Sequence, residues 1–238
     1  MSGKKARIAV ALDVNQLSQA LRLVEALHKE VDYFKVGLEL LHAEGTPRVL
    51  AALQSAGAML FVDWKLHDIP ETVKKAVQAI APFEVPYFNL HASTGRTSIH
   101  AAVEAAGKSR VLGVTVLTSL DDAECTEIFG AAADIKVPQF ARTFVSLGGH
   151  AIICSAKEAQ LLRNMPELDS AELWTPGIRP LWAAARDQKR VLSPADAVRA
   201  GADVLIIGRP ITQPPGEIGS PVEAAKRIRA EIEEALAA

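Results

Sequence analysis

Eight short apolar segments, separated by stretches with helical periodicity, constrain the fold of this chain more than any other feature. They span residues 7–13, 33–37, 59–65, 86–91, 111–118, 150–155, 172–177 and 203–208. Most are apolar without a break instead of alternating with polar residues, which is typical of strands buried on both faces of a parallel sheet. Eight strands, each followed by a helix, predict a (β/α)8 barrel, and an open doubly wound sheet is the competing α/β architecture.

The eight repeats fill residues 1–238 without a Pro/Gly-rich linker or a low-complexity segment, which favours the closed barrel as a single domain. Helix starts are marked by a capping residue followed by proline, at Thr46-Pro47, Ser193-Pro194 and Ser220-Pro221. A further short helix is expected over residues 121–130, in the loop after the fifth strand.

Composition excludes several classes of protein. The formal net charge is -2, so nothing indicates a nucleic-acid or anionic-membrane binder, and any bound anion needs a local cluster of cations.

The apolar run near the N-terminus stops at Asp13, too early for a signal peptide, and no segment is long enough to span a membrane. Cys125 and Cys154 form no CxxC motif and are expected to be reduced. We therefore expect a cytoplasmic protein.

Charged and hydrogen-bonding residues follow the predicted strands, where a barrel of this type places its active site. The third strand ends in Asp63-Trp64-Lys65, and its two-residue period puts Asp63 and Lys65 on one face. Lys35 lies on the neighbouring strand, and Asp68 follows in the turn. These groups form either a catalytic cluster or a structural salt-bridge network.

The eighth strand ends in Gly208 and Arg209, where a backbone without a side chain and a guanidinium can together bind a phosphate. The alternative is a surface arginine beside a turn. Polar residues also end the first strand (Asp13), the fourth (Asn89 and His91), the fifth (Thr118) and the seventh (Arg179).

Other motifs give weaker signals. His67-Asp68 resembles a metal-binding pair, but no second His/Asp cluster accompanies it, and His91 either lines the site or packs behind it. The chain has no GxGxxG, Walker or HExxH motif. We expect neither a metal nor an organic cofactor.

Six segments in order resemble the orotidine 5′-phosphate decarboxylase family over nearly the whole chain. They are FKVG (34–37), DWKLHDIPET (63–72), LTS (117–119), PGIRP (176–180), DQKRVLSPADAVRAGAD (187–203) and IIGRPIT (206–212). The resemblance implies a (β/α)8 barrel that works as a homodimer without metal or cofactor. It also implies decarboxylation of orotidine 5′-monophosphate to UMP and CO2, the last step of UMP synthesis.

Carried over by position, the resemblance implies that Lys65 protonates C6 after CO2 leaves and that Asp63 lies against the departing carboxylate. Lys35 and Asp68 complete the charged set, with Asp68 and Thr72 supplied by the partner subunit. The remaining implied contacts are Asp13 and Lys35 to ribose hydroxyls, Thr118 to the pyrimidine amide, and Arg179, Gln188, Gly208 and Arg209 to the phosphate side.

The chain departs from the family pattern at Trp64, at Glu71 and in the bulky lid segment 181–186. We expect Trp64 to face the helix layer and Glu71 to lie near the dimer contact. Two rival functions stay open. One is a Mg²⁺-dependent sugar-phosphate decarboxylase or hexulose-phosphate synthase of the same barrel group, and the other is a non-catalytic barrel that binds a phosphorylated ligand.

Overall fold

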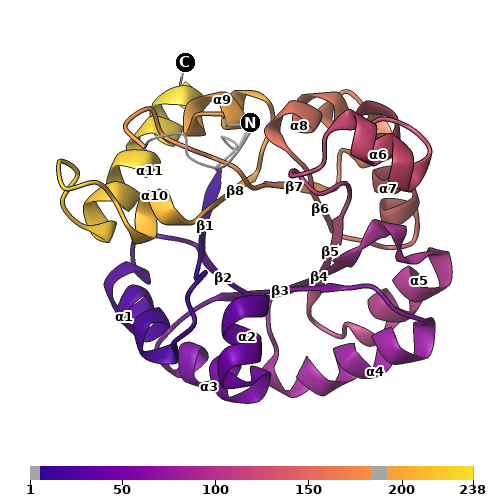
Figure 1. The fold of residues 1–238 in the computed structure, drawn as a ribbon, viewed down its shortest axis with the longest axis horizontal. Coiled ribbons are helices and arrows are strands. Elements are labelled where there is room, and N and C mark those ends of the chain that lie inside the picture. The colour runs from indigo at the N-terminus through magenta and orange to yellow at the C-terminus, as the bar shows by residue number, and fades with distance from the viewer. Residues whose placement is uncertain (1–5, 184–191, 238) are drawn as a thin grey trace.

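Eight parallel strands form a closed barrel in a computed structural model that describes residues 6–183 and 192–237 (Figure 1). The strands are β1 (Arg7–Ala11), β2 (Tyr33–Gly37), β3 (Leu60–Leu66), β4 (Tyr87–His91), β5 (Arg110–Val114), β6 (Ala151–Ile153), β7 (Glu172–Thr175) and β8 (Val204–Ile207). The barrel closes because β1 pairs with both β2 and β8. The closed barrel predicted from the sequence is therefore confirmed, and the open sheet is excluded.

Helices surround this ring of strands, and Figure 1 shows them on its outside. The α-helices are α1 (Leu17–Leu27), α2 (Leu38–Glu44), α3 (Thr46–Ser55), α4 (Pro70–Ile80), α5 (Arg96–Ala105), α6 (Asp122–Phe129), α7 (Ala133–Ser146), α8 (Ala156–Arg163), α9 (Pro194–Arg199), α10 (Arg209–Thr212) and α11 (Pro221–Ala237). The described residues also form the 3-10 turns η1 (Ala81–Phe83), η2 (Ala92–Thr94) and η3 (Pro166–Leu168). Among the described helices, none is both long and apolar enough to cross a membrane.

The helix starts agree with two of the three predicted caps. Ser193 accepts the Asp196 N–H at 3.1 Å, and Ser220 accepts the Glu223 N–H at 3.2 Å. The expected cap at Thr46 is wrong, because the helix already includes Thr46 and the cap position is Gly45. Gly45 is both the last capping residue of α2 and the first of α3. Its φ of +81 favours glycine at this turn between the two helices.

The predicted extra helix after the fifth strand is confirmed as α6, and its first turn is closed by a capping box from Asp121. Several predicted strands are shorter in the structure. Strand β5 ends at Val114, so Thr118 lies in the following turn, and β1 ends at Ala11, so Asp13 lies in a loop.

The core has two parts, inside the barrel and between the barrel and its helices. The inner part is rich in aromatic side chains, and the Trp174 ring lies 5.1 Å from Phe61, 4.6 Å from Tyr87 and 5.2 Å from Tyr33 between centroids. Adjacent strand residues point to opposite faces, so Leu173 packs in the outer part.

Glu172 organises the amino-terminal end of the barrel, beneath these rings. Its carboxylate accepts the Tyr87 hydroxyl at 3.2 Å and the Trp174 Nε1–H at 3.0 Å. It also pairs with Arg7 and Arg110, each at 3.0 Å. These groups fill the barrel from below, so a ligand cavity in the interior has to open at the opposite, carboxyl-terminal end.

Candidate active site

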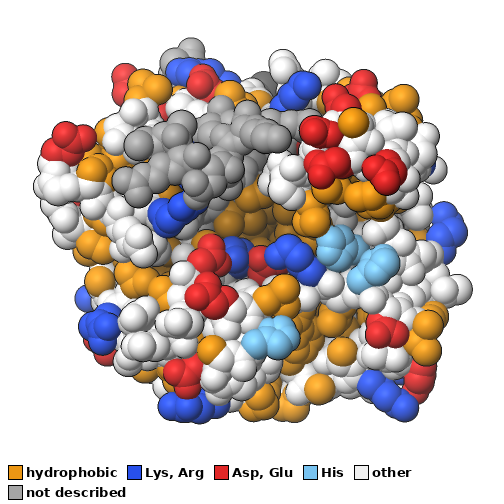
Figure 2. Space-filling view, in the orientation of Figure 1, with side chains coloured by type: hydrophobic (Ala, Val, Ile, Leu, Met, Phe, Trp, Pro, Cys, Tyr) orange, Lys and Arg blue, Asp and Glu red, His pale blue; other side chains and the backbone are white. Residues whose placement is uncertain are grey.

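A cavity of about 520 Å³ opens at the carboxyl ends of the strands. Its walls include the ends of β1, β2, β3 and β8 and the loops after β5 and β7, and its apolar floor is formed by inner-barrel residues such as Phe61 and Ile206. Figure 2 shows Lys/Arg and Asp/Glu side chains gathered in the hollow at the centre of this face. The structure therefore places a cavity where a (β/α)8 barrel is expected to carry its active site.

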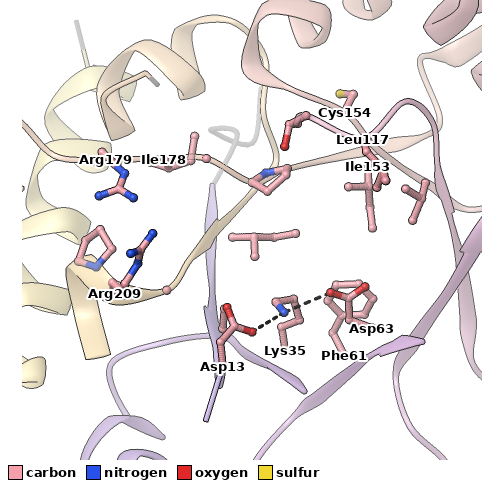
Figure 3. A pocket seen from close by; sticks show the side chains of 18 of the residues that line it. Asp13, Lys35, Phe61, Asp63, Leu117, Ile153, Cys154, Ile178, Arg179 and Arg209 are labelled. Carbon is pink, nitrogen blue, oxygen red and sulfur yellow. Dashed lines mark hydrogen bonds and ion pairs between the residues drawn. The ribbon is translucent and has the colours of Figure 1, made fainter. Parts of the chain in front are cut away.

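Four charged side chains form a connected row in this cavity, which we call the charged row: Asp13, Lys35, Asp63 and Lys65. The Lys35 Nζ lies 2.9 Å from Asp13 Oδ1 and 3.1 Å from Asp63 Oδ2, as Figure 3 shows. The Lys65 Nζ lies 2.6 Å from Asp63 Oδ1. The expectation that Lys35, Asp63 and Lys65 share one space is confirmed, and Asp13 joins them through Lys35.

Lys35 and Asp63, the two central groups of the charged row, stabilise each other in their ionised forms. Burial would raise the pKa of Asp63, but the ammonium groups of Lys35 and Lys65 and a hydrogen bond from Asn89 outweigh it and lower that pKa to about 2. Burial would likewise lower the pKa of Lys35, but Asp63 and Asp13 outweigh it and raise that pKa. Each charge in the interior of the row is therefore compensated by an opposite one.

Lys65 reaches the cavity through an irregular backbone. Its φ is +52, a region that residues other than glycine seldom adopt, and the pairing of β3 with β4 shifts between Val62 and Leu66. As expected, Asp63 and Lys65 both line the cavity, although the strand that carries them is not regular here. Trp64 turns outward and packs against the outer core, as expected.

Asn89 is the site residue to which the sequence assigned no role. Its side chain is fully buried on β4, and its Nδ2 donates to Asp63 Oδ1 at 2.7 Å. Its Oδ1 accepts the backbone N–H of Lys65 at 2.7 Å. The available signal was a polar residue inside an otherwise apolar strand, next to the strand that carries Asp63.

The two histidines beside the charged row do not form a metal site. The rings of His67 and His91 lie 5.6 Å apart, and burial, reinforced by His67 and Lys65, lowers the pKa of His91. His91 does not line the cavity, so it packs behind the site. Within residues 6–183 and 192–237, no cluster of three or more His, Cys, Asp or Glu side chains could hold a metal ion.

A second group of cations lies on the opposite side of the cavity. Figure 3 shows the guanidinium groups of Arg179 and Arg209 near one another, away from Asp63. Gly208 also lines the cavity, and a side chain added there would lie 3.6 Å from Ala11 Cβ. Two guanidinium groups beside a bare backbone suit a phosphate group.

Thr118 lines the same cavity from the turn after β5. Gln188, which the resemblance places at the phosphate, lies outside the described residues. Residues 184–186 of the expected lid segment 181–186 also lie outside the described residues. Leu181, at the start of that segment, is exposed. Glu71 is exposed on α4 and pairs with Lys75 at 3.3 Å.

Asp68 and Thr72 are not part of this cavity within one chain. They line a second cavity of about 410 Å³, formed by α2, the end of β3 and α4, where Lys65 is also a wall residue. The Asp68 carboxylate accepts the N–H of Ile69 at 2.7 Å. The structure thus does not join Asp68 to the charged row of its own chain, and its supply by a partner subunit stays a prediction.

Comparison with known proteins adds to this geometry. The model of the Orotidine 5'-phosphate decarboxylase / HUMPS family matches residues 6–228. The orotidine 5′-phosphate decarboxylase of Paramagnetospirillum magneticum is 41% identical, with 94% of this chain and 97% of the relative covered. That of Thermobifida fusca is 43% identical, with 96% of each chain covered. The crystal structure of orotidine 5′-phosphate decarboxylase from Lactobacillus acidophilus is 28% identical and superposes with a TM-score of 0.80, covering 96% of this chain and 99% of that one.

Proposed function

Because the chain belongs to the orotidine 5′-phosphate decarboxylase / HUMPS family, we propose that it is a carboxy-lyase that converts orotidine 5′-monophosphate to UMP and CO2 in pyrimidine biosynthesis. One observation carries the proposal beyond family membership. A single cavity holds the charged row on one side and two arginines on the other. That arrangement suits a substrate with a reacting carboxylate at one end and a phosphate at the other.

In this proposal Lys65 is the proton donor. Loss of CO2 leaves an electron pair on C6 that the pyrimidine ring delocalises poorly, so the carbanion needs a nearby positive charge and then a proton. The Lys65 ammonium stabilises the developing charge, transfers one proton to C6 and is reprotonated from solvent afterwards. Its ion pair with Asp63, at 2.6 Å, supports this role because it holds the Nζ within the cavity.

In the same proposal, Asp63 acts on the substrate carboxylate that leaves as CO2. Its pKa of about 2 keeps it ionised at neutral pH, so a substrate carboxylate placed beside it is repelled. The repulsion falls as the carboxylate becomes neutral CO2, and Asp63 therefore disfavours the bound substrate more than the transition state. Binding energy from the phosphate at Arg179 and Arg209 offsets that repulsion when the substrate binds.

We propose that the reaction uses no metal and no cofactor. The donor set of the cavity supports this, because both carboxylates of the charged row are bound by lysine ammonium groups at 3.1 Å or less. Lys65 supplies the positive charge that a metal ion would otherwise bring to the developing anion.

We also propose a homodimer in which Asp68 and Thr72 of one chain complete the site of the other. Within one chain both residues line the second cavity, which shares Lys65 with the first. Apolar side chains are exposed around it, with Leu38 46% and Ile69 66% accessible. A second copy seated on this face would bury them in a two-fold symmetric contact. The cytoplasmic location stays a prediction from the sequence.

The test is turnover of orotidine 5′-monophosphate in the presence of EDTA, followed by the ultraviolet change as UMP forms. Lys65→Ala is compared with Lys226→Ala, which removes a half-exposed lysine on α11 that does not line the cavity. We expect turnover in the wild type and in Lys226→Ala, and a loss of several orders of magnitude in Lys65→Ala, because only the latter lacks the proton donor.

A near-normal kcat in Lys65→Ala would refute the proton-donor role. Activity that EDTA abolishes and Mg²⁺ restores would refute the metal-free reaction. A folded wild-type protein without turnover would overturn the decarboxylase proposal, and a sugar phosphate with Mg²⁺ would then be the next substrate to test. Ligand binding without turnover of either substrate would favour the non-catalytic barrel.

A further inference from the structure

The side chain of Asn89 joins the two halves of the proposed catalytic pair. It accepts the backbone N–H of Lys65 and donates to Asp63 Oδ1, each at 2.7 Å. The same Asp63 Oδ1 accepts the Lys65 Nζ at 2.6 Å. Asn89, Asp63 and Lys65 thus form a closed hydrogen-bonded ring, which we call the Asn89 bridge.

We propose that Asn89 is a positioning residue, which fixes the Lys65 backbone and the Asp63 carboxylate in the geometry that the reaction needs. The inference rests on the proposed function, since it concerns the same site. Asn89 is fully buried and does not line the cavity, so it acts through its two partners and not by touching the substrate.

The chemistry of the two partners selects asparagine at this position. A backbone N–H can only donate, so it has to face the amide oxygen of Asn89, and an ionised carboxylate can only accept, so it has to face the amide nitrogen. Aspartate has the same shape but offers no donor when ionised. Leucine offers neither group, and glutamine is one methylene too long for a fully buried position.

The backbone of Lys65 explains why such a bridge is needed. A φ of +52 is costly for a residue with a side chain, and such conformations persist only where neighbouring groups hold them. The β3–β4 register shifts at this point, and the Lys65 N–H bonds to the Asn89 side chain instead of a strand carbonyl. Asn89 therefore supplies the contact that keeps Lys65 turned into the cavity.

Asn89→Asp gives the sharpest test, because it changes one donor and almost no volume. The new carboxylate would lie against Asp63, and such a pair binds one shared proton at a higher pH than an isolated carboxyl. With that proton the variant can again donate to Asp63. The kcat of Asn89→Asp relative to wild type should therefore rise as the pH falls from 8 to 5.5.

Other titratable groups face this ring, namely Lys35 from β2, Asp13 from the loop after β1, His67 after β3 and His91 on β4. They are present in wild type and variant alike, so the ratio of the two kcat values at each pH isolates the effect of position 89. A merely structural role of Asn89 would lower this ratio equally at all pH values.

Steady-state kinetics of Asn89→Ala and Asn89→Asp are compared with those of Ser109→Ala. Ser109 is also buried and also loses a side-chain hydrogen bond, to the Val85 carbonyl at 2.6 Å, but at the amino-terminal end of the barrel. We expect kcat to fall by about 100-fold in Asn89→Ala, the effect of a misplacement of about 1 Å, with KM changed less than about threefold. Ser109→Ala should lower the melting temperature and leave kcat unchanged.

A kcat within twofold of wild type in both Asn89 variants, or a kcat ratio for Asn89→Asp that does not depend on pH, would overturn the inference. If Asn89→Ala does not fold, the pH dependence of kcat in the isosteric Asn89→Asp still tests the inference. Hydrogen exchange of the Lys65 amide is a readout independent of turnover, and it should accelerate in Asn89→Ala; unchanged exchange would also overturn the inference. An inactive wild type would refute the proposed function, while this exchange measurement would still test the bridge.

Discussion

Replacing Lys35 by Met and Asp63 by Asn, singly and together, measures how strongly these two side chains stabilise each other in the folded protein. Their charged atoms lie 3.1 Å apart, and the two side chains are only 12% and 9% exposed. Each keeps a second partner in the single variants, since Lys35 also contacts Asp13 and Asp63 also contacts Lys65. The double-mutant cycle cancels these other contacts and leaves the coupling between Lys35 and Asp63.

The expected coupling follows from distance and burial. Two unit charges 3.1 Å apart attract by about 5 kcal/mol at an effective dielectric constant of about 20. The remaining partners compensate part of this in each single variant, so we expect a coupling of about 2 to 3 kcal/mol. The double variant should be less destabilised than the sum of the single variants, because neither charge is then left without the other.

The pKa of Asp63 supports this magnitude and sets its pH range. That pKa falls from the usual 3.8 to about 2 on folding, and each unit corresponds to about 1.4 kcal/mol, so all partners together contribute about 2 to 3 kcal/mol net of burial. A carboxyl whose pKa is lowered on folding stabilises the protein fully above its unfolded pKa. The contribution should therefore be complete at pH 7 and be lost as the pH falls below 4 towards 2.

Urea unfolding at pH 7 and constant protein concentration is followed by tryptophan fluorescence, to which the buried Trp174 contributes. It gives the unfolding free energies of the wild type, the two single variants and the double variant. The matched control is the same cycle on Lys108 and Glu84, which are closer, at 2.8 Å, but 84% and 66% exposed. The exposed pair should show a coupling several times smaller because water screens it. Equal couplings, or a Lys35–Asp63 coupling below about 1 kcal/mol, the upper end of the range for exposed pairs, would refute the reasoning.

Two further predictions concern packing and cysteine chemistry. A Cβ at Gly113 would lie 2.7 Å from Cγ of the Phe144 ring, so Gly113→Ala should lower the unfolding free energy by about 1 to 3 kcal/mol. Gly216→Ala, where an added Cβ meets nothing within 4 Å, is the control, and equal denaturation midpoints for the two variants would contradict the packing argument. Cys125 and Cys154 are both buried, and burial raises the pKa of the Cys154 thiol, so a thiol reagent should label both only in urea; stoichiometric labelling of the native protein would show that this burial is wrong.

The barrel and the position of its site followed from the sequence because both depend on local patterns. Unbroken apolar runs indicate two-sided burial, and parallel strands bring their carboxyl ends to one edge. Those two facts suffice to gather Lys35, Asp63 and Lys65 in one place, whatever the exact rotamers. The carboxyl end of the fifth strand was predicted too far along the chain, at Thr118 instead of Val114, because strand length depends on pairing with neighbouring strands.

The parts that could not be predicted depend on contacts between strands. The role of Asn89 requires the shifted β3–β4 register and the positive φ of Lys65, and neither follows from residue types in one strand. Helix α2 was also missed, because its seven residues continue directly from β2 and present no separate start signal. Asp68 shows a third limit, since a residue whose expected partner is another chain cannot be placed from one chain alone.

The filled amino-terminal end of the barrel limits how molecules can reach and leave the cavity. It is filled by Glu172, the two arginines that pair with it and the aromatic rings above it. These side chains fill the interior of the barrel at its amino-terminal end, so within the described residues the cavity opens at the carboxyl-terminal end of the strands. Under the proposed reaction, CO2 released beside Asp63 leaves at the same end of the barrel at which the nucleotide entered. Both products therefore leave at the carboxyl-terminal end of the barrel, and neither can pass through its filled amino-terminal end.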